Sequence, residues 1–513
     1  RRRRSTARDS HHSTGLTSSR MRLSGQRVIV IGSGPSGAMA AHTLVEHGLP
    51  VTLLESGTRV PPGFLVRAMG RNILRRRPVL QPNQRASPSE HGGAWFESLV
   101  PGGLSNYWVG AVPRFGPDDF REGERLHERY RWPLSYDELV PYYQRTERML
   151  RVVADRQDVP NLPAPVVYRA CSLPGGWRSV AHQAAAVGHG LAPMPLADGP
   201  PWMVARTGVG FNSFTHIVEP LLGYPNFELR LGAHVVQLEW RGQTREVSSV
   251  IYRDRATGRE ERLPVAAVVL AAGPLASTRL LLNSRSADFP EGLGNTEGLL
   301  GKYLHEHPSH WFRIELSERA LPRLGQAAYL TRGPSQTSSP LLAAACTIGF
   351  ASTTDKLWSA LPVPATRFGV LVFGTMVPVE SNFLRLHASD TDEFGLPTLD
   401  AHIAYTSDEL QNLAGARQKL ASILDSAGYA CSVPRYVPDP QPGMSVHYGG
   451  TVRMHASPKY GMLNAWNRLH AVDNVVVADA SAFTTGVEKN PTLTAMALAA
   501  RAAERLAQDL KAG

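Results

Sequence analysis

The stretch RVIVIGSGPSGAMAAHTLVEHGLPVTLLESG occupies residues 27–57. It begins with the apolar, β-branched run 28–31, which predicts a strand buried on both faces. Three glycines then follow with the spacing G-x-G-x-x-G, and residues 35–47 have the composition of a helix. A second apolar run at 51–54 predicts the next strand of a parallel β-α-β unit.

Each glycine of this turn has its own physical role. Gly32 permits the tight turn, Gly34 lets backbone N–H groups approach a pyrophosphate, and Gly37 lets the helix pack closely on the strand. The N-terminus of that helix favours phosphate charge. Glu55 ends the second strand near the usual position of a carboxylate that bonds a ribose 2′-OH. The order of these features predicts a dinucleotide site; the acid argues against NADP but does not choose between FAD and NAD.

Length and composition indicate a globular protein with two closely packed domains. The chain has 513 residues, too many for one core, with 19% charged and 42% hydrophobic residues. No run approaches the ~18 apolar residues of a membrane span. The net charge of +10 comes mostly from residues 1–22, which hold seven arginines and one aspartate. The remainder is only mildly basic, so we expect no nucleic-acid partner.

The first 22 residues and the cysteines bear on location. Residues 1–22 lack an apolar segment after the arginines, so they form no complete export signal and we interpret them as a disordered basic tail. Cys171, Cys346 and Cys431 are far apart and form no C-x-x-C. This excludes a disulfide framework and a thiol-redox motif. We expect a cytoplasmic location.

Two later segments fit a flat ligand. Residues 102–108, GGLSNYW, suit a backbone that passes close to such a ligand, although a tight turn would use the same residues. The run 265–270 predicts a buried strand that ends on Ala272 and Gly273 before a helix. This is where FAD proteins return the chain to the dinucleotide. Because no second G-x-G-x-x-G exists, we expect no separate NAD(P)H domain and predict FAD, reduced directly by substrate.

The rest of the chain predicts a mixed region that covers the cofactor. We expect little regular structure at 58–94 and a loop-rich stretch at 154–215. Helices are predicted after Ser135, within 133–153, and at 407–427. Strand-like runs occur at 227–246, 249–252, 312–316, 368–376, 384–386 and 401–405.

The C-terminal region contains a well-marked helix start. Residues 475–478 predict a buried strand that ends at Asp479. Asn490 and Pro491 are preferred residues for the N-cap and first position of a helix, which we place at 492–510.

Four segments together resemble the glucose–methanol–choline (GMC) family of FAD oxidoreductases. They are GGLSNYW, LLGKYLHEHP at 299–308, SVHYGGTVRM at 445–454, and the D-A-S…N-P-T-L-T-A-M region from Asp479. The last two are most similar to the pyranose-oxidase branch, whose members oxidise sugar hydroxyls. The resemblance covers nearly the whole chain after Met21.

The resemblance implies an α/β fold of the GMC and p-hydroxybenzoate-hydroxylase type. A Rossmann-type FAD-binding domain is interleaved in it with an α+β substrate domain built on an antiparallel sheet. We assign residues 23–120, 216–308 and 441–513 to the FAD-binding domain, and 121–215 and 309–440 to the substrate-binding domain.

The resemblance also implies the chemistry. His447 is the expected general base and Asn490 the donor that holds the substrate oxygen, while hydride passes to flavin N5. An alcohol pKa near ~16 lies far above ~6.5 for histidine, so the proton must leave nearly in step with the hydride or the alkoxide must be stabilised. The helix N–H groups from Thr492 onward would face the flavin C2 carbonyl and N1. Asp479 would bond the ribityl chain.

One departure concerns the flavin tether. Pyranose and choline oxidases attach flavin through a histidine in the glycine-rich turn, where this chain has Tyr107. We therefore predict non-covalent FAD, with O₂ or a quinone-like compound as electron acceptor, and no metal site. The predicted FAD contacts are Gly32, Gly34, Ser36, Gly37, Glu55, Gly103, Ser105, Asn106, Val236, Ala272, Gly273, Asp479, Ala480, Pro491 and Thr492.

These expectations give one main function and three alternatives. The main prediction is oxidation of a hydroxyl of a small-molecule alcohol, a sugar or glycoside, to a carbonyl. The first alternative is a tailoring oxidase or dehydrogenase for a non-sugar natural product. A redox-neutral lyase of the same fold, with FAD as structure, is the second, and a non-catalytic flavin-binding protein is the third.

Overall fold

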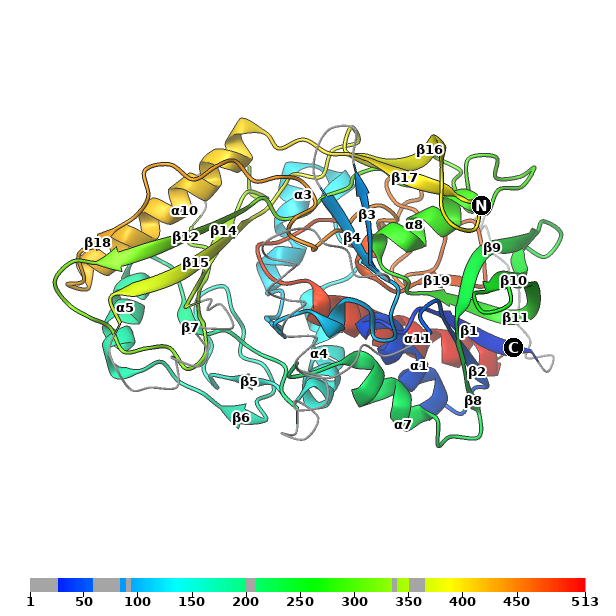
Figure 1. The fold of residues 1–513 in the computed structure, drawn as a ribbon, viewed down its shortest axis with the longest axis horizontal. Helices are drawn as coiled ribbons and strands as arrows, with labels where there is room; N and C mark the ends of the chain where they lie inside the picture. Colours follow the sequence, from blue (N-terminus) through cyan, green and yellow to red (C-terminus); the bar gives the residue numbers. More distant parts are fainter. Residues whose placement is uncertain are drawn as a thin grey trace, which may run out of the picture.

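The computed structural model describes residues 26–58, 84–88, 94–199, 209–334, 339–349 and 365–512. The predicted tail 1–22 and most of the excursion at 58–94 lie outside these residues. Figure 1 shows the described chain arranged around two sheets, with the first sheet on the right and the second on the left.

The first sheet has seven strands in the order β8-β2-β1-β11-β10-β9, with β19 also paired to β11. Strands β1, β2, β8 and β19 run parallel to their neighbours, whereas β9 and β10 are antiparallel. The run after Arg27 is buried on both faces, as its apolar, β-branched composition predicts. The bounds are β1 (Arg27–Ile31), β2 (Val51–Glu55), β8 (Phe227–Leu231), β9 (Ala233–Arg241), β10 (Glu246–Asp254), β11 (Glu260–Leu270) and β19 (Val475–Val477).

Small side chains let helices pack closely beside this sheet. Helix α1 (Pro35–Glu46) packs on α11 (Thr492–Ala512), and α11 packs on α4 (Tyr136–Leu150). Alanines make up much of the buried surface of both α1 and α11. Helix α8 (Pro274–Asn283) follows β11 directly and contacts β9.

The second sheet has six antiparallel strands in the order β18-β12-β15-β14-β13-β7. Helices α5 (Gly175–Ala186) and α10 (Ser407–Ser426) pack together beside it and share one apolar core with the strands. This confirms the predicted antiparallel sheet with helices. The strands are β7 (Leu191–Pro193), β12 (Ser309–Leu316), β13 (Ala328–Leu330), β14 (Ala344–Ile348), β15 (Arg367–Gly374) and β18 (Cys431–Ser432).

Several elements differ from the sequence prediction. Helix α5 lies in the stretch expected to be loop-rich, where it buries Trp177, Val180 and Ala184 at helical spacing. The flanking prolines and glycines conceal that pattern. Strand β17 (Pro397–His402) begins earlier than predicted and pairs with β16 (Phe383–Thr391). The remaining short strands and α-helices of the described chain are β3 (Gln84–Pro88), β4 (Ala94–Ser98), β5 (Val153–Ala154), β6 (Arg169–Ala170), α3 (Glu122–Leu126) and α7 (Glu219–Leu221).

The two predicted helix starts have different outcomes. Ser135 caps α4 as expected: its hydroxyl accepts from Glu138 N–H, and the Glu138 carboxylate accepts from Ser135 N–H. In α11 the first helical hydrogen bond joins Ala495 N–H to the Pro491 carbonyl. Pro491 is therefore the N-cap, and the prediction that Asn490 occupies this position is wrong by one residue.

The division into two domains stays a proposal. Helix α4 and hairpin β16–β17 were assigned to the substrate domain, yet their apolar residues belong to the core of the first sheet. None of the helices within the described ranges is long and apolar enough to cross a membrane.

Candidate active site

A cavity of about 890 Å³ lies between the two sheets. The carboxyl ends of β1, β2 and β11, the first turn of α11, and strands β14 and β15 all contribute to its wall. All predicted site residues except Gly37 and Asn106 line it: Gly32, Gly34, Ser36, Glu55, Gly103, Ser105, Val236, Ala272, Gly273, His447, Asp479, Ala480, Asn490, Pro491 and Thr492.

The glycines at one end of the cavity fall into two kinds. A Cβ atom at Gly37 would lie 2.0 Å from the Gly32 carbonyl oxygen, and one at Gly32, where φ is +99°, would lie 2.6 Å from that of Ala271. These glycines allow close packing of strand and helix. A Cβ atom at Gly34 or Gly273 would meet no atom of the described residues within 4 Å, although both residues line the cavity. Their open faces leave room for a ligand to approach the backbone.

Glu55 holds the glycine-rich turn in shape. Its carboxylate accepts hydrogen bonds from Ser33 N–H at 3.0 Å and Gly57 N–H at 2.7 Å, and also from the Ser33 hydroxyl. That hydroxyl oxygen accepts from Gly102 N–H at 2.9 Å. Burial raises the pKa of Glu55. The carboxylate therefore joins two loops in addition to facing the cavity.

Asp479 makes a similar clamp at the end of β19. It accepts from Gly273 N–H at 3.1 Å, Ser481 N–H at 3.0 Å and the Ser277 hydroxyl. Burial raises the pKa of this carboxyl as well. The clamp fixes the start of α8 against the end of β19 and leaves one edge of Asp479 on the cavity wall.

The turn around Asn106 is built from its own hydrogen bonds. The Asn106 amide donates to the carbonyls of Pro101 and Gly103 at 2.9 and 2.8 Å, and its oxygen accepts from the Asn212 amide. Asn106 is buried away from the cavity, so it shapes the turn that presents Gly103 and Tyr107 to the cavity.

Elsewhere on the cavity wall, the two predicted catalytic side chains meet. His447 Nε2 and Asn490 Nδ2 are 3.3 Å apart, and both residues line the cavity. Burial lowers the pKa of His447 to about 4, so its ring is neutral near pH 7. The ring packs edge-on against Phe373 at a centroid distance of 5.1 Å.

His307 is a site residue that the sequence prediction missed. His305 and Gly449 exchange backbone hydrogen bonds of 3.1 and 2.9 Å in an antiparallel bridge. The next pair of side chains on the same face is His307 and His447. Their Nδ1 atoms are 3.2 Å apart. The HEHP sequence at 305–308 marked the family resemblance, but only the bridge brings it to His447.

Glu306 lies between His305 and His307 in sequence, and its side chain binds the loop that carries His447. Its carboxylate accepts from the Tyr405 and Ser445 hydroxyls, both at 2.6 Å, and from Gly443 N–H. The Ser445 oxygen in turn accepts from His447 N–H at 3.3 Å. Burial raises the pKa of Glu306. These bonds fix the backbone that carries His447.

A buried ion network lies directly before Asn490. The Lys489 ammonium contacts Asp119 and Glu488, each at 2.8 Å, and Arg332 contacts Asp119 at 3.2 Å and Glu122. Lys489 is fully buried. Because a buried charge without a partner is costly, this network constrains the backbone on which Asn490 is mounted.

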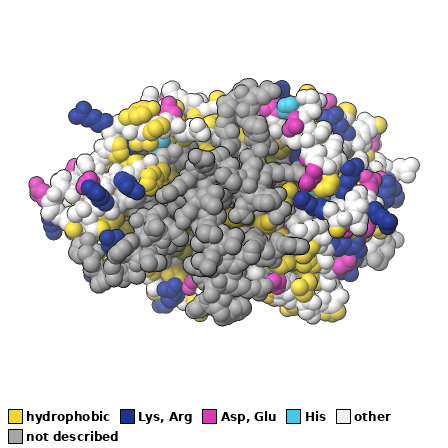
Figure 2. Space-filling model, in the orientation of Figure 1, with side chains coloured by type: hydrophobic (Ala, Val, Ile, Leu, Met, Phe, Trp, Pro, Cys, Tyr) yellow, Lys and Arg dark blue, Asp and Glu magenta, His cyan; other side chains and the backbone are white. Residues whose placement is uncertain are grey.

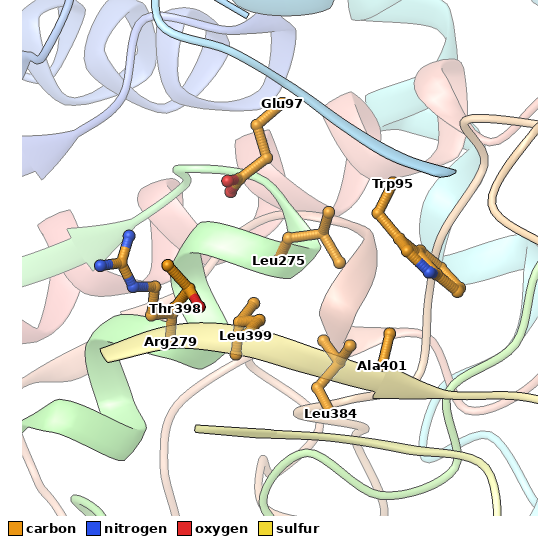
Figure 3. Close-up of a pocket in the computed structure, with 8 residues that line it drawn as sticks. All are labelled: Trp95, Glu97, Leu275, Arg279, Leu384, Thr398, Leu399 and Ala401. Carbon is orange, nitrogen blue, oxygen red and sulfur yellow. The ribbon is translucent and has the colours of Figure 1, made fainter. Parts of the chain in front are cut away.

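A second pocket of about 20 Å³ lies next to the large cavity and has room for about one water molecule. Figure 3 shows that Trp95 and Glu97 approach it from one side and Leu399 of β17 from the other. Leu275 and Arg279 of α8 line both spaces. Its size excludes a cofactor, so the chemistry belongs to the large cavity.

Comparison with known proteins gives two family matches. Residues 378–499 match the C-terminal GMC oxidoreductase family, and residues 27–287 match an FAD-binding domain family. A 6'''-hydroxyparomomycin C oxidase from Streptomyces lividus is 31% identical, over 94% of this chain and 92% of the relative. The chain is a GMC oxidoreductase.

Other relatives of this GMC oxidoreductase have different named substrates. A 2-methyl-1,2-propanediol dehydrogenase from Mycolicibacterium austroafricanum is 29% identical over 94% of this chain and 95% of that protein. A fructose dehydrogenase large subunit from Gluconobacter japonicus is 24% identical over 95% of this chain and 98% of that protein. The fold is similar to a solved pyridoxine 4-oxidase from Mesorbium loti, with a TM-score of 0.66, 20% identity and coverage of 94% of this chain and 99% of that one.

Family and fold confirm an FAD-dependent oxidoreductase that acts on alcohols, and the cavity fits FAD. The open faces of Gly34 and Gly273 lie beside the N-termini of α1 and α8, where helix N–H groups favour phosphate. The N-terminus of α11 lies next to Asn490 at the catalytic end. Among the described residues, no group of three or more His, Cys, Asp or Glu side chains is arranged to hold a metal ion.

Proposed function

We propose that this GMC oxidoreductase oxidises a hydroxyl of a sugar or glycoside to a carbonyl, with His447 as base and Asn490 as donor to the substrate oxygen. The observation that carries the proposal is the 3.3 Å contact between His447 Nε2 and Asn490 Nδ2 on the cavity wall. The relative named fructose dehydrogenase large subunit supports the sugar class.

In this proposal the two side chains have complementary tasks. A hydroxyl oxygen about 2.9 Å from both nitrogens would accept a hydrogen bond from Asn490 and donate one to His447. His447, neutral because burial lowers its pKa to about 4, can then take the hydroxyl proton. Asn490 stabilises negative charge on the oxygen while that proton leaves.

Because His447 is a weak base, the proton must leave nearly in step with the hydride, or the alkoxide must be stabilised. An alcohol pKa near ~16 lies about 12 units above that of His447, which corresponds to roughly 16 kcal/mol for proton transfer alone. Bound FAD supplies the two-electron acceptor for the hydride. The N-terminus of α11 adds unpaired backbone N–H groups to this end of the cavity, and they favour developing negative charge.

FAD is held non-covalently in this proposal. Tyr107 lines the cavity and lies in the glycine-rich turn, at the position where pyranose and choline oxidases attach their flavin through a histidine. Among the described residues of the cavity wall there is no cysteine, and the second histidine, His234, lies beside Ser56 near the other end. Acid precipitation of the protein should therefore release all flavin into solution.

A second substrate class is supported by the wall that the second sheet presents. Leu371 and Phe373 of β15 line the cavity together with Leu324, and Gln326 and Thr347 are among its few polar groups. Among the described residues of this wall, none carries a formal charge. Such a surface also suits a neutral non-sugar alcohol, and the relative named 2-methyl-1,2-propanediol dehydrogenase supports that class.

Anaerobic mixing tests the function. We expect a sugar or glycoside from a panel to bleach the visible absorption of the flavin, and O₂ or a quinone to restore it. Bleaching only by 2-methyl-1,2-propanediol or similar diols would replace the sugar class with the second one. A redox-neutral lyase would leave the flavin oxidised with every compound.

The His447→Ala variant tests the base. We expect the rate of flavin reduction to fall by about 10²–10⁴-fold with FAD content unchanged. Full activity in this variant would overturn the assignment of His447.

Location and partners complete the proposal. A cytoplasmic enzyme with a small-molecule alcohol and an O₂ or quinone-like acceptor is consistent with three free cysteines. On the face shown in Figure 2, Lys and Arg side chains of described residues are interspersed with Asp and Glu, which gives no support to nucleic-acid binding.

A further inference from the structure

We propose that His307 is a positioning residue: it holds His447 in the tautomer that carries its proton on Nδ1, so that Nε2 remains free to accept the substrate proton. The inference rests on the proposed role of His447. It concerns a residue to which the family resemblance assigns no function.

The first step identifies the acceptor on His447. The amide nitrogen of Asn490 lies 3.3 Å from His447 Nε2, and an amide nitrogen can only donate a hydrogen bond. Nε2 of His447 is therefore a lone-pair acceptor.

The second step fixes the proton of His447. A neutral His447 that accepts at Nε2 carries its proton on Nδ1, which lies 3.2 Å from His307 Nδ1. Two ring nitrogens in hydrogen-bond contact need one donor and one acceptor. His447 Nδ1 must therefore be the donor. Both rings are neutral near pH 7 because burial lowers both pKa values.

The third step follows at the far edge of the His447 ring. With hydrogen on Nδ1, Nε2 has a lone pair that points to the cavity and to the Asn490 amide, 3.3 Å away. A substrate hydroxyl can donate to this lone pair. The opposite tautomer would place hydrogen on Nε2, and this nitrogen could then not accept the proton of the substrate hydroxyl.

The surroundings hold both rings in place. The His305–Gly449 bridge sets the register of the two segments. Phe373 packs against both rings, with centroid distances of 4.9 Å to His307 and 5.1 Å to His447. The Ser445 oxygen accepts from the backbone N–H of both histidines at 3.3 Å. The His307–His447 contact is thus fixed from three sides.

Two substitutions at position 307 distinguish a positioning role of the His307 acceptor from a role of its ring in filling space. His307→Phe keeps a flat ring but removes the acceptor, and we expect flavin reduction to slow about 10- to 100-fold. His307→Gln retains an oxygen that can accept from His447 Nδ1, so it should recover most of the wild-type rate. His310→Phe is the matched control, because His310 is a nearby buried histidine, on β12, whose two ring nitrogens have no hydrogen-bond partner among the described residues. It should leave the rate unchanged.

A spectroscopic readout tests the tautomer itself. In ¹⁵N-histidine-labelled holoenzyme, we expect the His447 signal, assigned by its loss in His447→Ala, to show hydrogen on Nδ1. In His307→Phe, hydrogen should move to Nε2 in a substantial fraction of molecules. If the phenylalanine variant loses FAD or melts early, His307→Leu supplies a smaller non-accepting side chain.

The outcomes distinguish this inference from the proposed function. Hydrogen on Nε2 in the wild type, or equal rates in His307→Phe, His307→Gln and wild type, would overturn the positioning role. If His447→Ala is inactive in that case, His447 keeps its role as base. Full flavin reduction by His447→Ala would instead overturn the proposed function itself.

Discussion

The two ends of the cavity are built in different ways. We call Gly32, Gly34, Glu55, Gly273 and Asp479 the nucleotide end. Its residues lie at or just after the ends of parallel strands of the first sheet, and its carboxylates bind nearby backbone N–H groups.

The catalytic end, defined as His307, His447 and Asn490, is built from three segments far apart in the chain. Its side chains bind one another: two nitrogen–nitrogen contacts of 3.2 and 3.3 Å link them in a row. Under the proposed function, backbone shape at the nucleotide end decides what can bind, whereas the placement of protons at the catalytic end decides what can react. Changes at the first end should alter cofactor affinity, and changes at the second should alter rate.

The largest expected effect concerns the ion network under the catalytic end. Lys489→Met would leave Asp119 and Glu488 buried near each other with one fewer cation, and we expect a loss of about 3–5 kcal/mol in unfolding free energy. Lys302→Met removes a similar but exposed pair with Glu380 and should cost less than about 1 kcal/mol. Urea denaturation compares them. Equal losses would show that the network does not support the site.

The next prediction separates two asparagines. Asn490→Ala should slow anaerobic flavin reduction by about 10²–10³-fold while FAD stays bound, because only the oxygen-binding donor is lost. Asn106→Ala removes the bonds that shape a turn of the cofactor wall, so we expect weaker FAD binding and a smaller change in the rate of the FAD-loaded enzyme. Stopped-flow absorbance and flavin content measure both. The comparison fails if the two variants lose rate equally.

Two glycines sharpen the description of the nucleotide end. Gly37→Ala places a methyl group 2.0 Å from the Gly32 oxygen, so we expect destabilisation at the upper end of ~1–3 kcal/mol even without FAD. In Gly34→Ala the added methyl group has no described residue within 4 Å, so this change should leave the cofactor-free melting temperature unchanged while weakening FAD binding. Melting curves with and without FAD test this pair. A normal FAD affinity in Gly34→Ala would contradict the proposed contact.

The two ends should also respond oppositely to pH. Burial lowers the pKa of His305, beside the catalytic end, from 6.5 to about 4. Between these two pKa values, His305 is protonated in the unfolded chain but not in the folded chain. The free energy of unfolding therefore falls as pH drops below 6.5, by roughly 2 kcal/mol between pH 7 and 5. Burial raises the pKa of Glu55, so its contribution is largest at low pH and is lost as pH rises.

Urea midpoints between pH 5 and 7 measure this difference. We expect His305→Gln to flatten the loss of stability at acid pH and Glu55→Gln to steepen it. Identical slopes in both variants would show that neither group titrates as its burial implies.

The parts predicted well from sequence are those in which contacts are short-range. The β1–α1–β2 unit, the helix after Ser135 and the strand before Asp479 all lie within a residue or two of their predicted bounds. Helix α5 was missed because its apolar spacing stands between prolines and glycines, and its helical state depends on packing against α10. Asn490 carries a residue type typical of N-caps, but its recorded hydrogen bond goes to His447.

The sequence alone determined the FAD-binding unit, the family and the pair His447 and Asn490, because local spacing and motif identity encode them. Only the tertiary structure decided that His307 contacts His447, since an antiparallel bridge between residues 305 and 449 aligns segments 140 positions apart. The structure also turned Asn106 away from the cavity and gave Glu55 its second task as a clamp. The physical reason is that a motif specifies which groups are present, whereas the register between distant segments specifies which groups face one another.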